Sequence, residues 1–134
     1  MRLVLVNKIA ITHLKDNVTD RLLPDSPHAQ RPPLGRDERF LPAPIAEHGF
    51  SALIEIEYDS ENGPAQKNKY LFDAGTSENG VVFNSDLFGI ELQKVNAIVL
   101  SHGHFDHFTG LASVLKRISR PVKLYAHPDA FLKR

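Results

Sequence analysis

The chain has 134 residues and no net charge, because 16 lysines and arginines balance 16 aspartates and glutamates when the 7 histidines are neutral. This balance argues against a general binder of nucleic acid or of anionic membranes, since both require a surplus of positive charge. With 42% hydrophobic and 24% charged residues the composition is that of a soluble globular domain. The absence of cysteine excludes disulfides, thiolate metal sites and a cysteine nucleophile.

The amino-terminal part of the chain predicts a strand followed by a proline-rich excursion. Residues Leu3–Thr12 are rich in Val, Ile and Leu and predict a first strand or a pair of strands. Their apolar run, Leu3–Val6, is too short for a signal peptide or a membrane span, so we expect a cytoplasmic protein. Six of the nine prolines lie between Pro24 and Pro44. They predict a long loop at about residues 24–48, either a functional lid or a disordered insertion.

Strands and helices alternate after this loop. Phe50–Tyr58 and Lys69–Phe72 predict the two strands of a hairpin, joined by a turn at Ser60–Pro64. A helix is expected from about Asn79 to Phe88, with Gly89 as its C-cap.

The carboxyl-terminal part continues this alternation. Asn96–Leu100 predicts a short buried strand, and Phe108–Ile118 predicts an amphipathic helix on the sheet. The apolar residues at helical spacing are Phe108, Leu111, Leu115 and Ile118. Val122–Tyr125 predicts one more strand, and Pro128–Arg134 the first turns of another helix. That last helix has no layer to pack against, so we expect the chain to be cut from a longer domain.

The segment Ser101–His107, SHGHFDH, lies between the predicted buried strand and the amphipathic helix. Three imidazoles and one carboxylate in so short a segment are hard to explain as packing, because each would need polar partners at a buried strand end. A solvated turn with incidental histidines is the alternative. The ordered set of four side chains favours a divalent cation instead.

The spacing of these side chains predicts two cation positions. In an extended segment, residues two apart project to the same side, so His102 and His104 can reach one ion while Gly103 lets the backbone approach closely. Asp106 and His107 follow where the chain turns into the helix, and they would therefore aim at a neighbouring position. Nitrogen and oxygen ligands suit zinc, and ligand type alone also allows iron, manganese or cobalt.

The run AIVLSHGHFDHFTGL resembles the HxHxDH signature of the metallo-β-lactamase superfamily, and FDAG resembles the Asp-containing turn of that superfamily. Glu47–Glu55, EHGFSALIE, further resembles a subgroup related to the archaeal dihydropterin ribofuranosyl-aminobenzene phosphate synthase. The resemblance implies an α/β fold, the αββα sandwich. Residues 1–134 would form approximately its N-terminal half, a mixed sheet with helices on one face.

The resemblance also implies roles for single residues. His102 and His104 would hold the first metal, and Asp106 and His107 the second. Asp73 would support the metal loop through hydrogen bonds from behind the ligands, with a simple Asx turn as the alternative. Asp106 would also act as a catalytic residue that holds the attacking water or takes a proton from it.

Further ligands of the superfamily pattern, a third His, a bridging Asp and a later His, cannot be assigned in this chain. His127 follows too soon after the motif to be that third His, so we expect a cap or a surface residue. His48 faces the metal cleft in one interpretation, with Glu47 as its partner, and is a loop-end residue in the other. His13 and His28 are expected at the surface.

The predicted function is a metal-dependent hydrolase that cleaves an ester, thioester, amide or phosphodiester in a small-molecule substrate, with two cations that lower the pKa of a water. The second hypothesis is a synthase or transferase of pterin biosynthesis, with Arg31, Arg36 and Arg39 as candidates for phosphate binding. The third is a truncated, non-catalytic half-domain that needs a partner, either a second copy or the missing C-terminal half.

Overall fold

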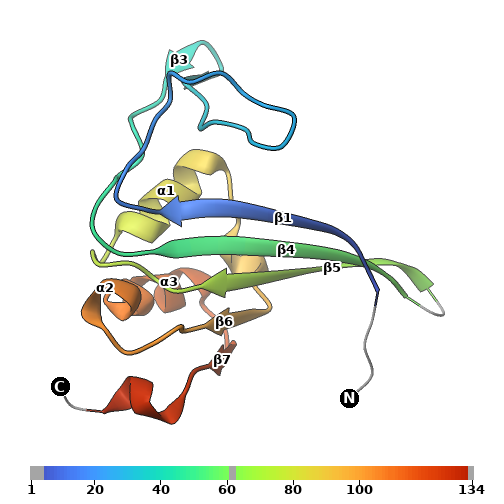
Figure 1. The fold of residues 1–134 in the computed structure, drawn as a ribbon, viewed down its shortest axis with the longest axis vertical. Coiled ribbons are helices and arrows are strands. Elements are labelled where there is room, and N and C mark those ends of the chain that lie inside the picture. Colours follow the sequence, from blue (N-terminus) through green and yellow to red (C-terminus); the bar gives the residue numbers. More distant parts are fainter. Residues whose placement is uncertain (1–4, 61–62, 133–134) are drawn as a thin grey trace.

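The computed structural model describes residues 5–60 and 63–132 and contains one mixed five-stranded sheet with helices packed on it (Figure 1). The strands follow the order β1-β4-β5-β6-β7. Their bounds are β1 (Val6–Lys15), β4 (Ser51–Ser60), β5 (Gly63–Phe72), β6 (Ala97–Val99) and β7 (Lys123–Tyr125). The pairs β1·β4 and β4·β5 are antiparallel, and β5·β6 and β6·β7 are parallel. The predicted mixed α/β sheet is therefore confirmed.

The helices follow the strands in alternation, as predicted. Their bounds are α1 (Gly80–Phe88), the 3-10 turn η1 (Leu92–Lys94), α2 (Phe105–Phe108), α3 (Leu111–Ile118) and the 3-10 turn η2 (Pro128–Phe131). Gly89 ends α1 in the left-handed conformation, with φ of 72°, and so provides the predicted C-cap. None of the helices in residues 5–60 and 63–132 has the length and apolar content needed to cross a bilayer.

Some of the predicted segments extend beyond the described residues. They are the first two residues of the predicted strand Leu3–Thr12, two residues of the turn Ser60–Pro64, and the last two residues of the predicted helix Pro128–Arg134. Within the described part, this last segment forms the short 3-10 turn η2 instead of an α-helix.

The strand predicted at Lys69–Phe72 is longer than expected, since β5 already begins at Gly63. Its outer half is polar and carries no apolar alternation. Cross-strand ion pairs accompany this pairing, because Lys69 Nζ lies 2.7 Å from Glu55 Oε1. Lys67 Nζ lies 3.2 Å from Glu57 Oε1 in the same ladder. The prediction of a short strand was wrong because charged cross-strand pairs replace the hydrophobic pattern.

The single helix predicted at Phe108–Ile118 is also wrong, because the chain forms two helices that are separated at Thr109 and Gly110. Backbone groups around this break bond to neighbouring loops. The Asp106 carbonyl accepts from the Phe50 amide, and the Gly110 amide donates to Gly75 O at 3.3 Å. These competing bonds interrupt the helix and allow α2 and α3 to run in different directions (Figure 1).

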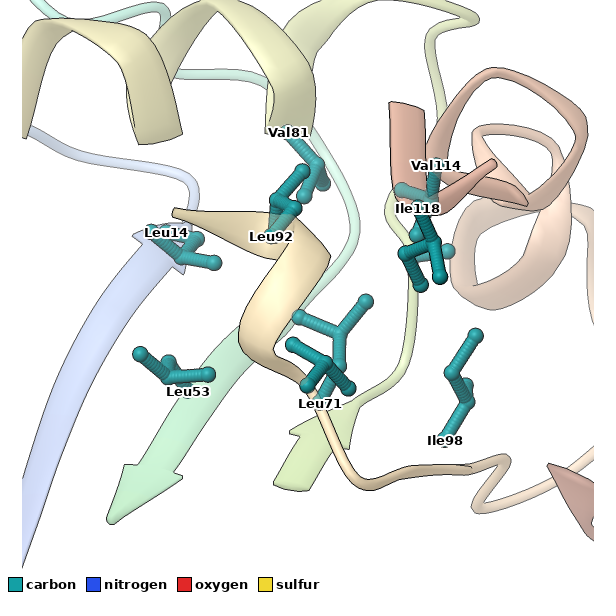
Figure 2. Packing of buried hydrophobic residues seen from close by; sticks show 10 residues of the cluster. Leu14, Leu53, Leu71, Val81, Leu92, Ile98, Val114 and Ile118 are labelled. Atoms are coloured by element: carbon teal, nitrogen blue, oxygen red, sulfur yellow. The ribbon is translucent and has the colours of Figure 1, made fainter. Parts of the chain in front are cut away.

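One face of the sheet packs against α1, η1 and α3 in a continuous apolar core (Figure 2). The sheet contributes Leu14, Leu53, Leu71 and Ile98, and the helices contribute Val81, Leu92, Val114 and Ile118. All of these side chains are at most 1% exposed. This core fixes the carboxyl ends of β5 and β6 relative to the helices that follow them.

The opposite face of the sheet is apolar as well, but it is open. The antiparallel register pairs Ile9 with Ile56 and Ile11 with Ile54, and it pairs Ile54 with Tyr70 in the next strand. Ile9 and Ile11 are 57% and 58% exposed. An apolar sheet face of this kind is typical of a layer that packs against a second sheet.

The proline-rich loop projects from the β1 side of the sheet, at the opposite end of the molecule from β7 (Figure 1). It contains a short ladder of β2 (Gly35–Arg36) and β3 (Arg39–Phe40). Arg21 donates to Pro33 O at 2.6 Å, and Arg36 donates to Leu87 O at 3.1 Å, in the last turn of α1. The two guanidinium groups therefore donate to backbone carbonyls, and these hydrogen bonds fix the path of the loop.

The burial of α3 differs from the predicted apolar stripe, because Leu115 is 41% exposed whereas Ile118 is 1% exposed. We expect Ile118→Ala to lower the free energy of unfolding by about 2–5 kcal/mol, since it opens a cavity in the core. Leu115→Ala removes a similar side chain from the surface and should cost less than about 1 kcal/mol. Urea denaturation followed by circular dichroism measures both, and equal losses would contradict the assigned face.

Candidate metal centre

The segment after β6 forms one end of the sheet. The parallel strands β5, β6 and β7 have their carboxyl ends at the same end of the sheet, and α2 lies beside this end (Figure 1). His104 has extended backbone angles, with φ of −83° and ψ of 147°, and directly precedes α2. Asp106 lies in the first turn of α2, where a carboxylate is favoured. The fold thus brings the predicted metal-ligating side chains to a strand end, as expected from their position in the sequence.

His102 and His104 present two ring nitrogens to one point. Nε2 of His102 lies 3.0 Å from Nδ1 of His104, with the two rings nearly perpendicular. The close backbone approach expected at Gly103 exists, but its partner is η2, since an added Cβ would overlap the Ala130 carbonyl. Both imidazoles are therefore held on the same side of the chain, on the pattern expected for residues two apart.

Asp106 and His107 form the second pair. Oδ2 of Asp106 lies 3.4 Å from Nε2 of His107. Their side chains are 12% and 19% exposed, so both are largely enclosed. The rings of His102 and His107 have their centres 4.1 Å apart, which makes the two pairs immediate neighbours.

The geometry of each pair fits a shared divalent cation. Two ligands at about 2.0–2.1 Å from a tetrahedral zinc ion are separated by about 3.3 Å. The separations of 3.0 Å and 3.4 Å lie within a few tenths of an ångström of this value. Within residues 5–60 and 63–132, no group of three or more His, Asp or Glu side chains is arranged to hold an ion. Each pair would therefore provide only two ligands from this part of the chain.

Asp73 lies beneath both pairs as a fully buried carboxylate. It follows β5 with a left-handed backbone, at φ of 57°, which Asp tolerates better than most residues. Oδ1 accepts from the Ser101 amide at 2.8 Å, and Oδ2 accepts from the Ser101 hydroxyl and from Nδ1 of His107, both at 2.7 Å. A carboxylate behind a ligating imidazole orients the ring and raises its basicity.

Ser101 is a site residue to which the sequence reasoning gave no role. Its hydroxyl donates to Asp73 and lies 2.8 Å from Nδ1 of His102. Because the hydroxyl proton is donated to Asp73, the Ser101 oxygen accepts a hydrogen bond from the Nδ1–H group of His102. The sequence signal that could have identified Ser101 is its position directly after a buried strand and next to His102. Asp73 thus orients His107 by a direct hydrogen bond and His102 through the Ser101 hydroxyl.

These bonds set the tautomers of two histidines. Neutral His102 and His107 both carry their proton on Nδ1, which leaves Nε2 as the lone-pair nitrogen. In each ring, Nε2 is the atom that faces the other member of its pair. Nε2 of His102 consequently accepts a hydrogen bond from Nδ1 of His104 in the metal-free protein, and a cation held between these two atoms would replace that proton.

His48 reaches the same centre from the loop before β4. Its Nε2 lies 3.1 Å from Oδ2 of Asp106, although the side chain is 74% exposed. The expected partner, Glu47, points the other way and pairs with Lys15 at 2.7 Å and with the Ser77 amide at 2.9 Å. The predicted pairing of Glu47 with His48 was wrong, because Lys15 and the Ser77 amide hold the Glu47 carboxylate while His48 lies at Asp106.

The remaining histidines lie away from this centre. His127 caps η2, where its Nδ1 accepts from the Asp129 amide at 3.3 Å. His28 is exposed, and His13 packs edge-on against Phe50 at the surface of the sheet. These positions agree with the cap and surface roles expected for them.

We expect Ser101→Ala to redistribute the His102 proton between the two ring nitrogens, because the variant lacks the hydroxyl that accepts from Nδ1. His107 should keep its proton on Nδ1, since Asp73 still accepts it. Ser101→Thr retains the hydroxyl and should preserve both tautomers. Two-bond proton–nitrogen correlation spectra of the metal-free protein at about pH 8, above the ordinary imidazole pKa, measure this. An unchanged His102 tautomer in Ser101→Ala would refute the assigned chain of hydrogen bonds.

Comparison with known proteins identifies relatives that share this region. The 7,8-dihydropterin-6-methyl-4-(beta-D-ribofuranosyl)-aminobenzene-5'-phosphate synthase of Methanocaldococcus jannaschii is 40% identical over 86 residues, which cover 64% of this chain and 28% of the relative. Ribonuclease Z of Methanococcus aeolicus is 31% identical over 88 residues, which cover 62% of this chain and 24% of the relative. The chain thus spans less than a third of the length of these relatives.

A solved structure and a family profile also match this chain. The Rm3 metallo-beta-lactamase is 26% identical with a TM-score of 0.41, and the match covers 62% of this chain and 31% of that chain. The profile of the metallo-beta-lactamase superfamily matches residues 63–134, which contain β5, Asp73 and the whole Ser101–His107 segment. Since this match spans more than half of the chain, the protein belongs to the metallo-beta-lactamase superfamily.

Proposed function

We propose that this chain provides part of the active site of a metal-dependent hydrolase that uses two divalent cations. His102 and His104 would hold one cation, and Asp106 and His107 the other. The observation that carries this proposal is that each pair has its ligating atoms 3.0 Å or 3.4 Å apart while Asp73 and Ser101 occupy the opposite ring nitrogens. Zinc suits this set of nitrogen and oxygen ligands, and iron or manganese are the alternatives.

When bound, such cations would supply Lewis acidity, which lowers the pKa of a water and polarises the bond under attack. The residues of the chain would orient this chemistry. Asp106 has a largely enclosed carboxylate that lies 3.1 Å from Nε2 of His48, so it is suited to hold the attacking water or to accept its proton. Hydrolysis of an ester, thioester, amide or phosphodiester in a small-molecule substrate is the reaction class that follows.

The relatives are more than three times as long as the matched region, so further ligands would come from chain beyond these residues. The open apolar face around Ile9 and Ile11 supports this proposal, because a second layer would bury it. If a second copy or a separate partner supplied that layer, the chain alone would be a non-catalytic half-domain. Sedimentation analysis with and without zinc separates a monomer from such an assembly.

A synthase or transferase of pterin biosynthesis is the second candidate, and the 40% identity to a protein named as such a synthase favours it. The phosphate group of the substrate of such a synthase would need cationic side chains as partners. Arg31, Arg36 and Arg39 remain the candidates, and Arg36 already uses one of its five N–H donors on the Leu87 carbonyl at the end of α1. Product analysis distinguishes the two activities, because a hydrolase splits one substrate with water and a synthase joins two substrates.

We expect His104→Ala to weaken zinc binding at least ~10-fold, since loss of a partner that only supports a ligand already costs 10–100-fold. His127→Ala is the matched control, because His127 caps η2 and lies outside the two pairs. Titration of the metal-free protein with zinc against a chromophoric chelator measures both affinities. Equal affinity in wild type and His104→Ala would remove the central assignment.

A further inference from the structure

Lys15, the last residue of β1, is a charged side chain without solvent contact. Its side chain is 0% exposed, and its Nζ lies 2.7 Å from Oε1 of Glu47, whose side chain is 24% exposed. A buried ammonium is costly unless a carboxylate compensates it. The side chain lies against the turn into α1, where an added Cβ at Gly80 would overlap Nζ. The absence of a side chain at Gly80 therefore leaves room for the buried ammonium.

Two further hydrogen bonds hold Glu47. Its Oε1 accepts from the Ser77 amide at 2.9 Å, and its own amide donates to Asp16 O at 3.1 Å. Burial raises the pKa of Glu47, but the hydrogen bonds from Lys15 and Ser77 and the charge of Lys15 together lower it below its ordinary value. The carboxylate is thus the point at which the end of β1 and the turn into α1 are joined.

Residues 48–50 lie against Asp106 and Thr76, and Asp106 belongs to the segment Ser101–His107, which we call the metal loop. The Thr76 hydroxyl donates to the His48 carbonyl, and the Phe50 amide donates to the Asp106 carbonyl at 3.4 Å. Gly49 has φ of 113°, and an added Cβ would overlap Asp106 O. Only glycine allows this approach. The segment 48–50 therefore spans from the buried ion pair to the first turn of α2.

An exposed imidazole on a loop has many rotamers, and ordering it costs conformational entropy. His48 is 74% exposed and makes its 3.1 Å contact with Asp106 from this segment. The backbone on one side of His48 is anchored by the buried ion pair, and the backbone on the other side is anchored on Asp106 O. The anchors, and not packing around the ring, define where the imidazole lies.

We propose that Lys15 and Glu47 are positioning residues: their buried ion pair fixes segment 48–50 on the metal loop and so holds the His48 imidazole at the Asp106 carboxylate. The importance of the His48–Asp106 contact for catalysis rests on the proposed function, whereas the existence of this contact does not depend on that proposal. A merely structural pair would stabilise the fold without controlling the local order of this segment. The two roles can be separated experimentally.

The experiment compares Lys15→Met and Glu47→Gln with Lys69→Met in the metal-free protein. Lys69 of β5 forms an ion pair of the same length, 2.7 Å, with Glu55 of the neighbouring strand β4. Both Lys15→Met and Glu47→Gln should raise amide exchange at least ~10-fold at Phe50 and Gly75, which bond to Asp106 O and Phe50 O. The Ala74 amide, bonded to His107 O, should keep its rate. Nuclear Overhauser contacts between the His48 ring and the Asp106 Hβ protons should also be lost, whereas Lys69→Met should leave all of these signals unchanged.

The double variant Lys15→Met/Glu47→Leu tests the structural alternative, because an apolar pair of similar volume can restore the urea midpoint of a buried ion pair. The proposal requires that this variant still lacks the His48–Asp106 contacts, since its residue 47 has no carboxylate for the Ser77 amide. Recovery of those contacts together with the midpoint would overturn it. Unchanged Phe50 and Gly75 exchange in Lys15→Met would overturn it as well. A failure of zinc binding would refute the proposed function instead, and these metal-free readouts would remain valid.

Discussion

The candidate metal centre depends on one buried carboxylate, Asp73. A carboxylate with no solvent contact is tolerated only when donors compensate its charge, and here the donors are the Ser101 amide, the Ser101 hydroxyl and Nδ1 of His107. Satisfying this requirement fixes one histidine directly and a second through the serine. The same bonds that remove the cost of a buried charge therefore turn Nε2 of His102 toward His104 and Nε2 of His107 toward Asp106.

The sheet brings these groups together because the carboxyl ends of its parallel strands lie at the same end of the sheet. β5 leads into Asp73 and β6 leads into Ser101, so residues 28 positions apart in sequence become hydrogen-bonded neighbours. The long loop reaches the same end at His48, after an excursion anchored by arginine–carbonyl bonds. One apolar layer supports this end, and the opposite apolar face of the sheet is open. The centre accordingly lies at the margin of a layer rather than deep inside a core.

Where the sequence failed, a tertiary contact outweighed a local pattern. The helix predicted at Phe108–Ile118 is broken because backbone groups around Gly110 bond to other loops. The outer half of β5 carries no hydrophobic alternation, and its charged partners in β4 become visible only once the register is known. Glu47 and His48 are adjacent in sequence, yet Glu47 pairs with Lys15 while His48 contacts Asp106.

By itself, the sequence determined the alternation of strands and helices, the position of the His and Asp side chains at a strand end, and membership of the superfamily. These features depend on residue type and on spacing over a few positions, where sterics and side-chain chemistry act locally. Only the tertiary structure decided that Ser101 joins Asp73 to His102, that Lys15 is buried with Glu47, and that His48 meets Asp106. Each of these contacts joins groups through side-chain directions and strand register, which become defined when distant segments pack together.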